Sequence, residues 1–197
     1  MIAMSGHVQV ETTTHKKDSG SILGALKRLV TGESLFLNHF TPNGGPGEVY
    51  FGTALSGDMM QYDLNGPGIM VQGGSYVASA PSVDMDIQWQ GLGKTFFSGE
   101  SMFLIRLSGQ GPVVFNSFGA IYPIEVNGDY IVDTGHIVAF EETLNYEITK
   151  AGGSWLSSIL GGEGLVCKFR GQGTVWCQSH NAGSFGAALG PMLKARG

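Results

Sequence analysis

One phrase occurs three times in this chain, and it limits the possible folds more than any other feature. The phrase is a Gly-Glu pair, an apolar run, a glycine-rich turn and a second apolar run, and its copies cover residues 32–51, 99–118 and 162–177. The Gly-Glu pairs lie 67 and then 63 residues apart, which exceeds the usual solenoid period and indicates a duplicated β unit. Two apolar runs around a glycine turn are typical of a β-hairpin, so we predict three hairpins.

An alternating segment precedes each of the three phrases. Polar and apolar residues alternate at 8–12, 83–88 and 144–149, as they do in strands with one buried face. Asn-Gly pairs at 65–66 and 127–128 predict tight turns ahead of the second and third of these strands, because both residue types tolerate positive φ. A full unit is therefore turn, strand, strand, loop and hairpin.

The first unit begins in its middle, because no segment ahead of residue 8 matches residues 58–77. We expect one β domain at 1–181, made of a partial unit at 1–52 and full units at 53–118 and 119–181, followed by a tail at 182–197. Either the chain is truncated at its N-terminus, or a neighbour covers the strand edge left open. With 32 glycines and 42% hydrophobic residues, the composition favours many short strands, so the predicted class is all-β.

Charge and hydropathy exclude several classes of protein. The net charge is −5 with only 11 Lys and Arg, whereas phosphate binding needs a concentrated basic patch, so we expect no nucleic-acid partner. The chain lacks an apolar run of about 18 residues, which a membrane helix requires. Its first residues show no secretory pattern. We therefore predict neither a membrane span nor a signal peptide.

The two cysteines lie at mirror positions of the third predicted hairpin. With Gln172 at its centre, Cys167 would face Cys177. Cross-strand neighbours have Cβ atoms roughly 4.5–5.5 Å apart, a little longer than the disulfide mean. Two reduced core thiols are the plainest interpretation, and a redox disulfide and a metal site are the alternatives. No second cysteine pair or nearby histidine completes a tetrahedral metal site.

Histidines and carboxylates form no recognisable catalytic motif. A metal-bearing double-stranded β-helix usually presents two histidines separated by one residue, and no His-x-His occurs. His136 followed by Glu141 comes nearest, although a turn or surface role suits His136 better. Asp84 and Asp86 alternate with apolar residues, as on a solvated strand face. Phosphate loops and a Gly-x-Ser-x-Gly elbow are also absent, so we expect no enzyme and no cofactor.

The repeated Gly-Glu pairs contain Glu33, Glu100 and Glu163. A glutamate just before an apolar strand can accept hydrogen bonds from the turn of a neighbouring unit. The alternative is a ring of converging carboxylates in a symmetric assembly.

The segment between the alternating strand and the predicted hairpin is apolar in every unit, although loops are normally polar. These segments lie at 22–30, 93–97 and 154–160, and the first has helical spacing. Internal symmetry would gather them on one face, for contact with a partner protein or a membrane surface. The alternative is that they pack between subunits. The contact residues that we expect are Ile22, Leu23, Leu26, Leu29, Phe96, Phe97, Trp155 and Leu156.

Short motifs at 32–37, 71–75, 132–140 and 162–165 resemble the mitochondrial-biogenesis (altered inheritance of mitochondria) family and its bacterial relatives. The resemblance covers about residues 1–181. It implies an attenuator-protein-like fold, similar to the tryptophan RNA-binding attenuation protein and of double-stranded β-helix type, and assembly into homo-oligomeric rings, with a trimer favoured. Family members usually carry an additional N-terminal strand segment. The basic RNA-contacting residues of the attenuation protein have no counterpart here, so RNA binding is not carried over.

These observations lead to three functional hypotheses. The first is a non-enzymatic, homo-oligomeric β scaffold that contacts a partner protein or membrane surface through its apolar loops. A cupin-like small-molecule or metal-binding enzyme is the second, and it depends on fold alone. The third is an RNA-binding attenuator-like protein. The resemblance implies a cytoplasmic location in a bacterium and a mitochondrial one in a eukaryote.

Overall fold

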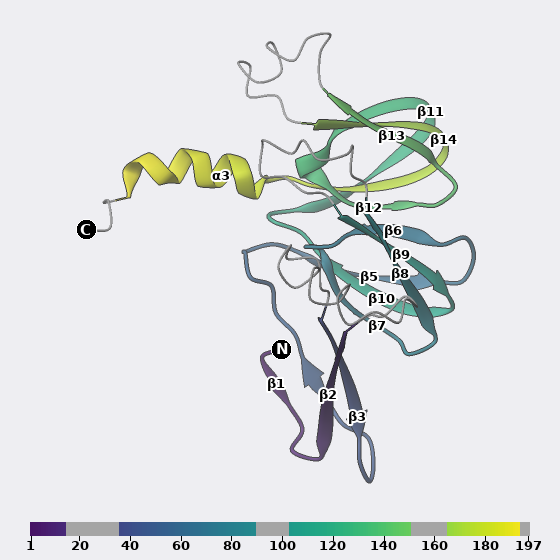
Figure 1. Ribbon diagram of the computed structural model, residues 1–197, viewed down its shortest axis with the longest axis vertical. Helices are drawn as coiled ribbons and strands as arrows, with labels where there is room; N and C mark the ends of the chain where they lie inside the picture. The colour runs from purple at the N-terminus through teal and green to yellow at the C-terminus, as the bar shows by residue number, and fades with distance from the viewer. Residues whose placement is uncertain (15–35, 90–102, 151–164, 194–197) are drawn as a thin grey trace, which may run out of the picture. The chain divides into compact units, whose positions relative to one another are not determined.

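The computed structural model describes residues 1–14, 36–89, 103–150 and 165–193. Most of these residues form antiparallel strands, joined by one α-helix and two short 3₁₀ helices, which confirms the predicted all-β class (Figure 1). Contacts between residues divide the chain into two units, Met1–Gly52 and Thr53–Gly197.

The first unit consists of two strand pairs. β2 (Val8–Thr14) pairs with β3 (Phe36–Pro42), and β1 (Ala3–Met4) pairs with β4 (Val49–Tyr50). β2 contains the alternation at 8–12, so the strand predicted there is confirmed.

The second unit holds one seven-stranded and one three-stranded sheet. Its elements are β5 Met59–Leu64, β6 Ile69–Gln72, β7 Tyr76–Ser79, β8 Val83–Trp89, β9 Phe103–Gly109, β10 Gly111–Asn116, β11 Ile121–Asp133, η1 Thr134–His136, β12 Ile137–Glu141, β13 Asn145–Lys150, β14 Leu165–Gln178, α3 Ala182–Leu189 and η2 Gly190–Met192. In the larger sheet the order is β11-β14-β12-β6-β9-β8, and β13 also pairs with β14. In the smaller sheet β10 lies between β5 and β7. β8 and β13 confirm the other two alternating strands.

The second and third glycine-rich turns of the repeated phrase are Gly-Gln-Gly segments, at 109–111 and 171–173. Neither is a hairpin turn, so the hairpins predicted there are wrong. β9 and β10 meet at Gln110 without pairing, because β9 pairs with β6 and β8 while β10 pairs with β5 and β7. β14 runs unbroken through its own copy of the motif. The four flanking glycines have positive φ, +108° at Gly109, +136° at Gly111, +124° at Gly171 and +159° at Gly173. Glycine tolerates this backbone region at no steric cost, so the strand bends there.

The first copy of the phrase is not a hairpin either, since β3 and β4 pair with β2 and β1 instead of each other. Of the two Asn-Gly pairs, the one at 65–66 begins a bend between β5 and β6, which lie in different sheets. The turn predicted at 127–128 is wrong. There β11 continues to Asp133 with Gly128 opposite Gly171, because β14 holds both halves of β11 in one ladder.

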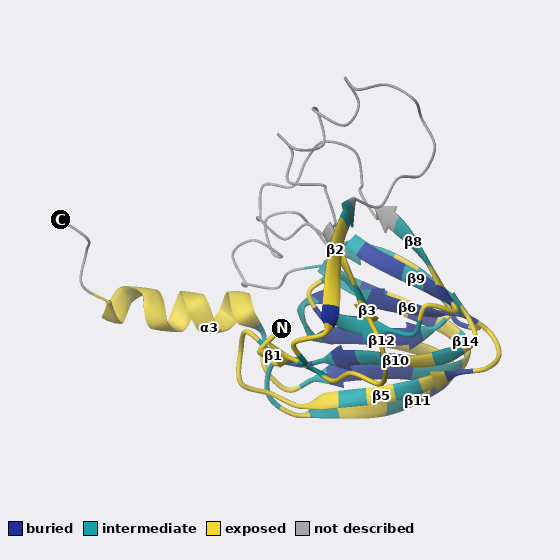
Figure 2. Ribbon diagram, turned by 90° about the horizontal axis from the view of Figure 1, so that it is seen from below, coloured by how far each residue is buried: buried dark blue, intermediate teal, exposed yellow. Residues whose placement is uncertain are grey.

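The core of the second unit forms where strands of the two sheets face each other (Figure 2). The ring of Phe140 meets those of Tyr146 and Phe169, with centroids 4.9 and 5.0 Å apart. The ring of Trp176 on β14 meets Tyr62 at 5.2 Å and Phe115 at 5.9 Å. Both partners belong to the three-stranded sheet, so that sheet packs against the C-terminal half of β14.

The two halves of the second unit, residues 53–118 and 119–181, use the same pairing pattern. Val113 of β10 lies opposite Ser79 of β7, just as Val175 of β14 lies opposite Phe140 of β12. β10 also pairs with β5 as the second half of β14 pairs with β11. β9 pairs with β8 as the first half of β14 pairs with β13.

A strand pair and an ion pair join the two halves. β12 pairs with β6, placing Phe140 opposite Met70. Beside this junction Arg106 Nε lies 2.5 Å from Glu142 Oε1, and Arg106 Nη2 donates to Glu142 Oε2 at 2.8 Å. These hydrogen bonds hold the pKa of Glu142 below its ordinary value. The two side chains are 34% and 35% exposed, so solvent screens the pair and limits its contribution.

We expect a double-mutant cycle with Arg106→Gln and Glu142→Gln to give a coupling free energy of about 0.5–1 kcal/mol at pH 7. A lowered pKa stabilises the folded state above the unfolded pKa, so the coupling should vanish as the pH falls through the pKa of Glu142. Urea unfolding at pH 7 and pH 3 measures both values. The exposed pair of Arg170 and Asp129 is the control and should show no measurable coupling. Equal coupling at both pH values would contradict the assignment.

Candidate functional site

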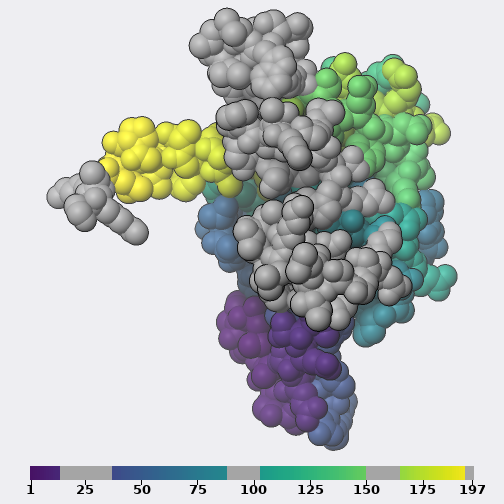
Figure 3. All heavy atoms as spheres, in the orientation of Figure 1, coloured from purple at the N-terminus to yellow at the C-terminus, as the bar shows by residue number. Residues whose placement is uncertain are grey.

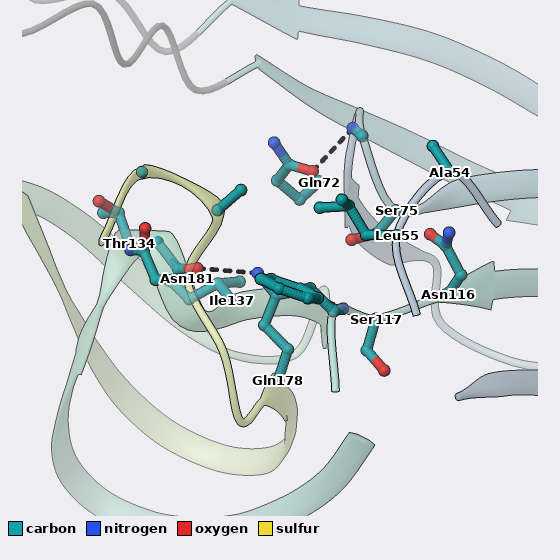
Figure 4. A pocket seen from close by; sticks show the side chains of 15 residues that line it. Ala54, Leu55, Gln72, Ser75, Asn116, Ser117, Thr134, Ile137, Gln178 and Asn181 are labelled. Carbon is teal, nitrogen blue, oxygen red and sulfur yellow. Dashed lines mark hydrogen bonds between the residues drawn. The ribbon is translucent and has the colours of Figure 1, made fainter. Parts of the chain in front are cut away.

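A cavity of about 630 Å³ opens in the second unit where several strands end (Figure 4). We call it the polar cavity. Its lining carries amides and hydroxyls but no charged or histidine side chain. The lining residues are Ala54, Leu55, Gln72, Gly74, Ser75, Asn116, Ser117, Phe118, Thr134, Gly135, Ile137, Gln178, Asn181, Ala182 and Gly183.

Equivalent strand ends from both halves of the unit build the polar cavity. They are the turn between β6 and β7 with the end of β10, and η1 with the end of β14. Gln178 links the second pair of segments, because its Oε1 accepts from Phe118 N–H at 2.8 Å and its Nε2 donates to Gly135 O at 2.9 Å. His136 Nδ1 lies 2.7 Å from Gln178 O. The predicted turn role of His136 agrees with its place in η1.

Helix α3 begins at the cavity. Asn181 is its N-cap, with Oδ1 accepting from Ser184 N–H at 3.0 Å. A Cβ on Gly135 would lie 1.8 Å from Asn181 Nδ2, so only glycine lets the cap approach η1 this closely. Every residue of α3 is exposed (Figure 2), and Figure 3 shows the helix projecting from the rest of the second unit.

The second notable feature is the outer side of β11 at residues 130–132, which we call the open edge. β11 is the terminal strand of its sheet and pairs only with β14 among the residues that the structure describes. Tyr130 is 43% and Ile131 60% exposed, and Figure 2 shows most of β11 in the exposed colour. An unpaired strand edge with apolar residues is a template for another strand.

The cysteines do not face each other, and the predicted mirror pairing is wrong. Both stand on β14, ten positions apart, as free and fully buried thiols. The error follows from the missing hairpin, because the chain continues straight past Gln172. Burial raises the pKa of Cys167 to about 12 and that of Cys177 to about 11. Thiols with such pKa values stay protonated and unreactive at neutral pH.

Within the described ranges, no group of three His, Cys, Asp or Glu side chains could hold a metal ion. In the same part of the chain, no helix has the length and apolar character needed to cross a bilayer.

The predicted contact residues lie outside the part of the chain that the structure describes. This holds for Glu33, Glu100 and Glu163, and for Ile22, Leu23, Leu26, Leu29, Phe96, Phe97, Trp155 and Leu156. The sequence analysis missed the open edge and the polar cavity. Ser75 ends the short motif at 71–75 and Asn116 lies in none of the short motifs, so only the alignment of equivalent strand ends could have singled out the pair.

Comparison with known proteins identifies relatives of the whole chain. A family model described as "Mitochondrial biogenesis AIM24" matches residues 1–180. An uncharacterized protein of Streptococcus pyogenes serotype M6 is 30% identical over 194 residues, or 96% of this chain and 77% of that protein. A crystal structure of a Streptococcus pyogenes protein is 28% identical with a TM-score of 0.80, and the match covers 98% of this chain and 86% of that one.

We expect the unfolding free energy to fall as the pH rises from 8 to 10. The unfolded thiols ionise near pH 9, whereas the folded ones stay protonated, so each thiol should cost about 1.4 kcal/mol of stability over this interval. Urea unfolding of the wild type and of Cys177→Ala measures the effect. The variant should lose about 1.4 kcal/mol of this pH dependence, and an unchanged dependence would contradict the burial of Cys177.

Proposed function

The chain belongs to the mitochondrial biogenesis AIM24 family, whose model matches nearly its full length, and we propose that it works as a non-enzymatic, homo-oligomeric β scaffold. The observation that carries the proposal is the open edge at 130–132. Its exposed apolar side chains and its unpaired outer backbone groups suit a strand from a second copy of the same chain.

Pairing inside the second unit supports the choice of a strand for the open edge. Ile131 lies opposite Lys168, and Met70 lies opposite Arg106. Lys168 and Arg106 both stand three residues before a Gly-Gln-Gly segment. Ile131 and Met70 therefore hold equivalent places. Met70 is covered on its other side by Phe140 of β12, whereas Ile131 has no such partner among the described residues.

The same reasoning selects the partner segment. Phe140 lies opposite Val175, and Met4 lies opposite Val49 in the first unit. Each valine stands two residues after a glycine, Gly47 or Gly173, so Met4 holds the place in the first repeat that Phe140 holds in the third. β12 of the third repeat (119–181) fills the edge of β6 in the second repeat (53–118). By analogy, β1 of another copy would fill the equivalent edge of β11. We therefore pair Met4 of one copy with Ile131 of the next.

Exposure on both segments supports this head-to-tail contact. Ile2 is 71% and Met4 38% exposed in the first unit, beside 60% for Ile131 in the second. Pairing would cover apolar surface on both copies and satisfy the backbone groups of two edge strands. A head-to-tail contact repeats until it closes, which produces a ring when the rotation between copies allows.

The three apolar connections form the contact surface of the proposed scaffold. Each joins the two strands of an antiparallel pair at the same end: β2 to β3, β8 to β9, and β13 to β14. Equivalent attachment points support the idea that the connections act together on a partner protein or membrane surface. The cupin-like and RNA-binding hypotheses stay untested predictions, and no contact among the described residues favours either.

Assembly should fail when a charge is placed on the open edge. We expect Ile131→Lys to weaken self-association at least about tenfold, because a lysine on an edge strand opposes strand addition. Native mass spectrometry and light scattering over a range of concentrations measure this. Tyr122→Lys is the matched control, since Tyr122 is 43% exposed on the same strand but belongs to the half whose counterpart β5 pairs only with β10 among the described residues. A wild-type monomer, or equal effects of the two changes, would contradict the proposal.

Disulfide cross-linking checks the proposed pairing of Met4 of one copy with Ile131 of the next. A chain with Met4→Cys and Ile131→Cys should form disulfide-linked multimers on oxidation, whereas Met4→Cys with Tyr122→Cys should stay largely monomeric on a non-reducing gel. The native thiols are buried and should not interfere. Cross-linking by both pairs alike would reject the register.

A membrane surface is tested by flotation with phosphatidylcholine vesicles containing phosphatidylglycerol. We expect the wild type to float and Leu26→Asp with Trp155→Asp to stay in the dense fraction, because charged residues are poorly accommodated at the apolar boundary. Asn65→Asp, at an exposed turn, is the control with an equal change of charge per site. If the wild type does not float, the membrane version is wrong and the partner-protein version remains.

A further inference from the structure

Ser75 places an unpaired hydroxyl at the polar cavity. The residue is only 4% exposed, and its side chain has no hydrogen-bond partner in the part of the chain that the structure describes. No fully buried side-chain oxygen or nitrogen there lacks a partner, so this hydroxyl must be reachable from the cavity that Ser75 lines (Figure 4). A buried polar group without a partner in the protein calls for an external one.

The equivalent positions in the other half of the unit are satisfied. Tyr76 lies opposite Phe115 as Ile137 lies opposite Cys177, so Ser75 corresponds to His136 and Asn116 to Gln178. His136 and Gln178 both use their polar side-chain atoms within the protein, as described above.

The shorter Ser75 and Asn116 make no such bonds, and no side-chain partner is found for Asn116 among the described residues. Both nevertheless line the polar cavity. Two unpaired side chains, at places where the counterparts are paired, form a polar corner that is complete only with a ligand.

Several groups around the polar cavity can donate hydrogen bonds to a ligand, including the Ser75 hydroxyl and the Asn116 amide. Gln72 Oε1 accepts from Gly74 N–H at 2.7 Å, and the NH₂ end of Gln72 has no acceptor among the described residues. At α3, Asn181 satisfies Ser184 N–H, while the backbone N–H groups of Ala182 and Gly183 precede the first helical bond and so have no acceptor within the helix. A helix N-terminus adds a positive dipole end. No acidic side chain lines the cavity, and the nearby Asp133 carboxylate already accepts from Gly135 N–H at 2.8 Å, so donors at the lining favour an anion.

Apolar side chains also line the cavity, which is large enough for an organic molecule. Leu55, Phe118 and Ile137 line it beside the polar groups. A volume of about 630 Å³ falls in the range typical of small-molecule sites. We infer that the polar cavity binds a small organic carboxylate, with its oxygens at Ser75, Asn116 and the start of α3 and its apolar body against these three side chains.

Benzoate and phenylacetate are suitable probes, with benzamide and phenylacetamide as their uncharged counterparts. Calorimetry and saturation-transfer NMR on the full chain measure binding. We expect at least one carboxylate to bind with a dissociation constant below about 10 mM and at least about tenfold more tightly than its amide, since only the anion gains from the helix dipole and charged hydrogen bonds. Failure of both carboxylates, or equal binding of acid and amide, would overturn the inference.

Charge placed in the cavity gives the decisive comparison. Asn116→Asp should weaken carboxylate binding at least about tenfold by like-charge repulsion, with little effect on the amide. Asn65→Asp adds the same charge at the exposed turn between β5 and β6 and should change nothing. Ser75→Ala should weaken the carboxylate about threefold to tenfold, and circular dichroism confirms that each variant is folded. Equal effects of the two Asn→Asp changes would reject the site.

Discussion

The fold depends on glycines that bend long strands. At Gly109 and Gly111, and again at Gly171 and Gly173, the backbone has positive φ, which residues with a Cβ rarely adopt. A bent strand can give its first half to one set of neighbours and its second half to another, as β9 and β10 do. Because the bend recurs in each half of the second unit, the same set of partners recurs with it.

The bend also explains why the unit has unequal edges. β6 is covered on both sides, by β9 and β12, while the corresponding part of β11 is covered only by β14 in the described part of the chain. β12 of the second half fills the edge of β6 in the first half. The equivalent edge of β11 therefore stays unpaired among the described residues. The proposed assembly follows from that open edge, and the proposed cavity ligand from a parallel asymmetry between paired and unpaired strand ends.

Local sequence patterns predicted the strands well and their partners poorly. The alternation at 8–12, 83–88 and 144–149 identifies β2, β8 and β13 because a half-buried strand needs only local information. An apolar run, a glycine turn and another apolar run look the same whether the chain folds back or bends onward. Only distant partners, such as β5 and β7 for β10, decide between the two, so the hairpins and the facing cysteines were predicted wrongly. The cavity residues come from separate strand ends, and although the motifs at 71–75 and 132–140 contain some of them, no local pattern shows that these segments meet.

Hydrogen exchange at the amides of residues 130–132 tests the central claim most directly, because it reads the open edge itself. We expect the amides of this stretch that point away from β14, together with those of β1 that point away from β4, to become protected as the protein concentration rises, while the amides of β5 keep their exchange rates. Protection that is independent of concentration, or an assembled protein in which residues 130–132 still exchange freely, would contradict the account.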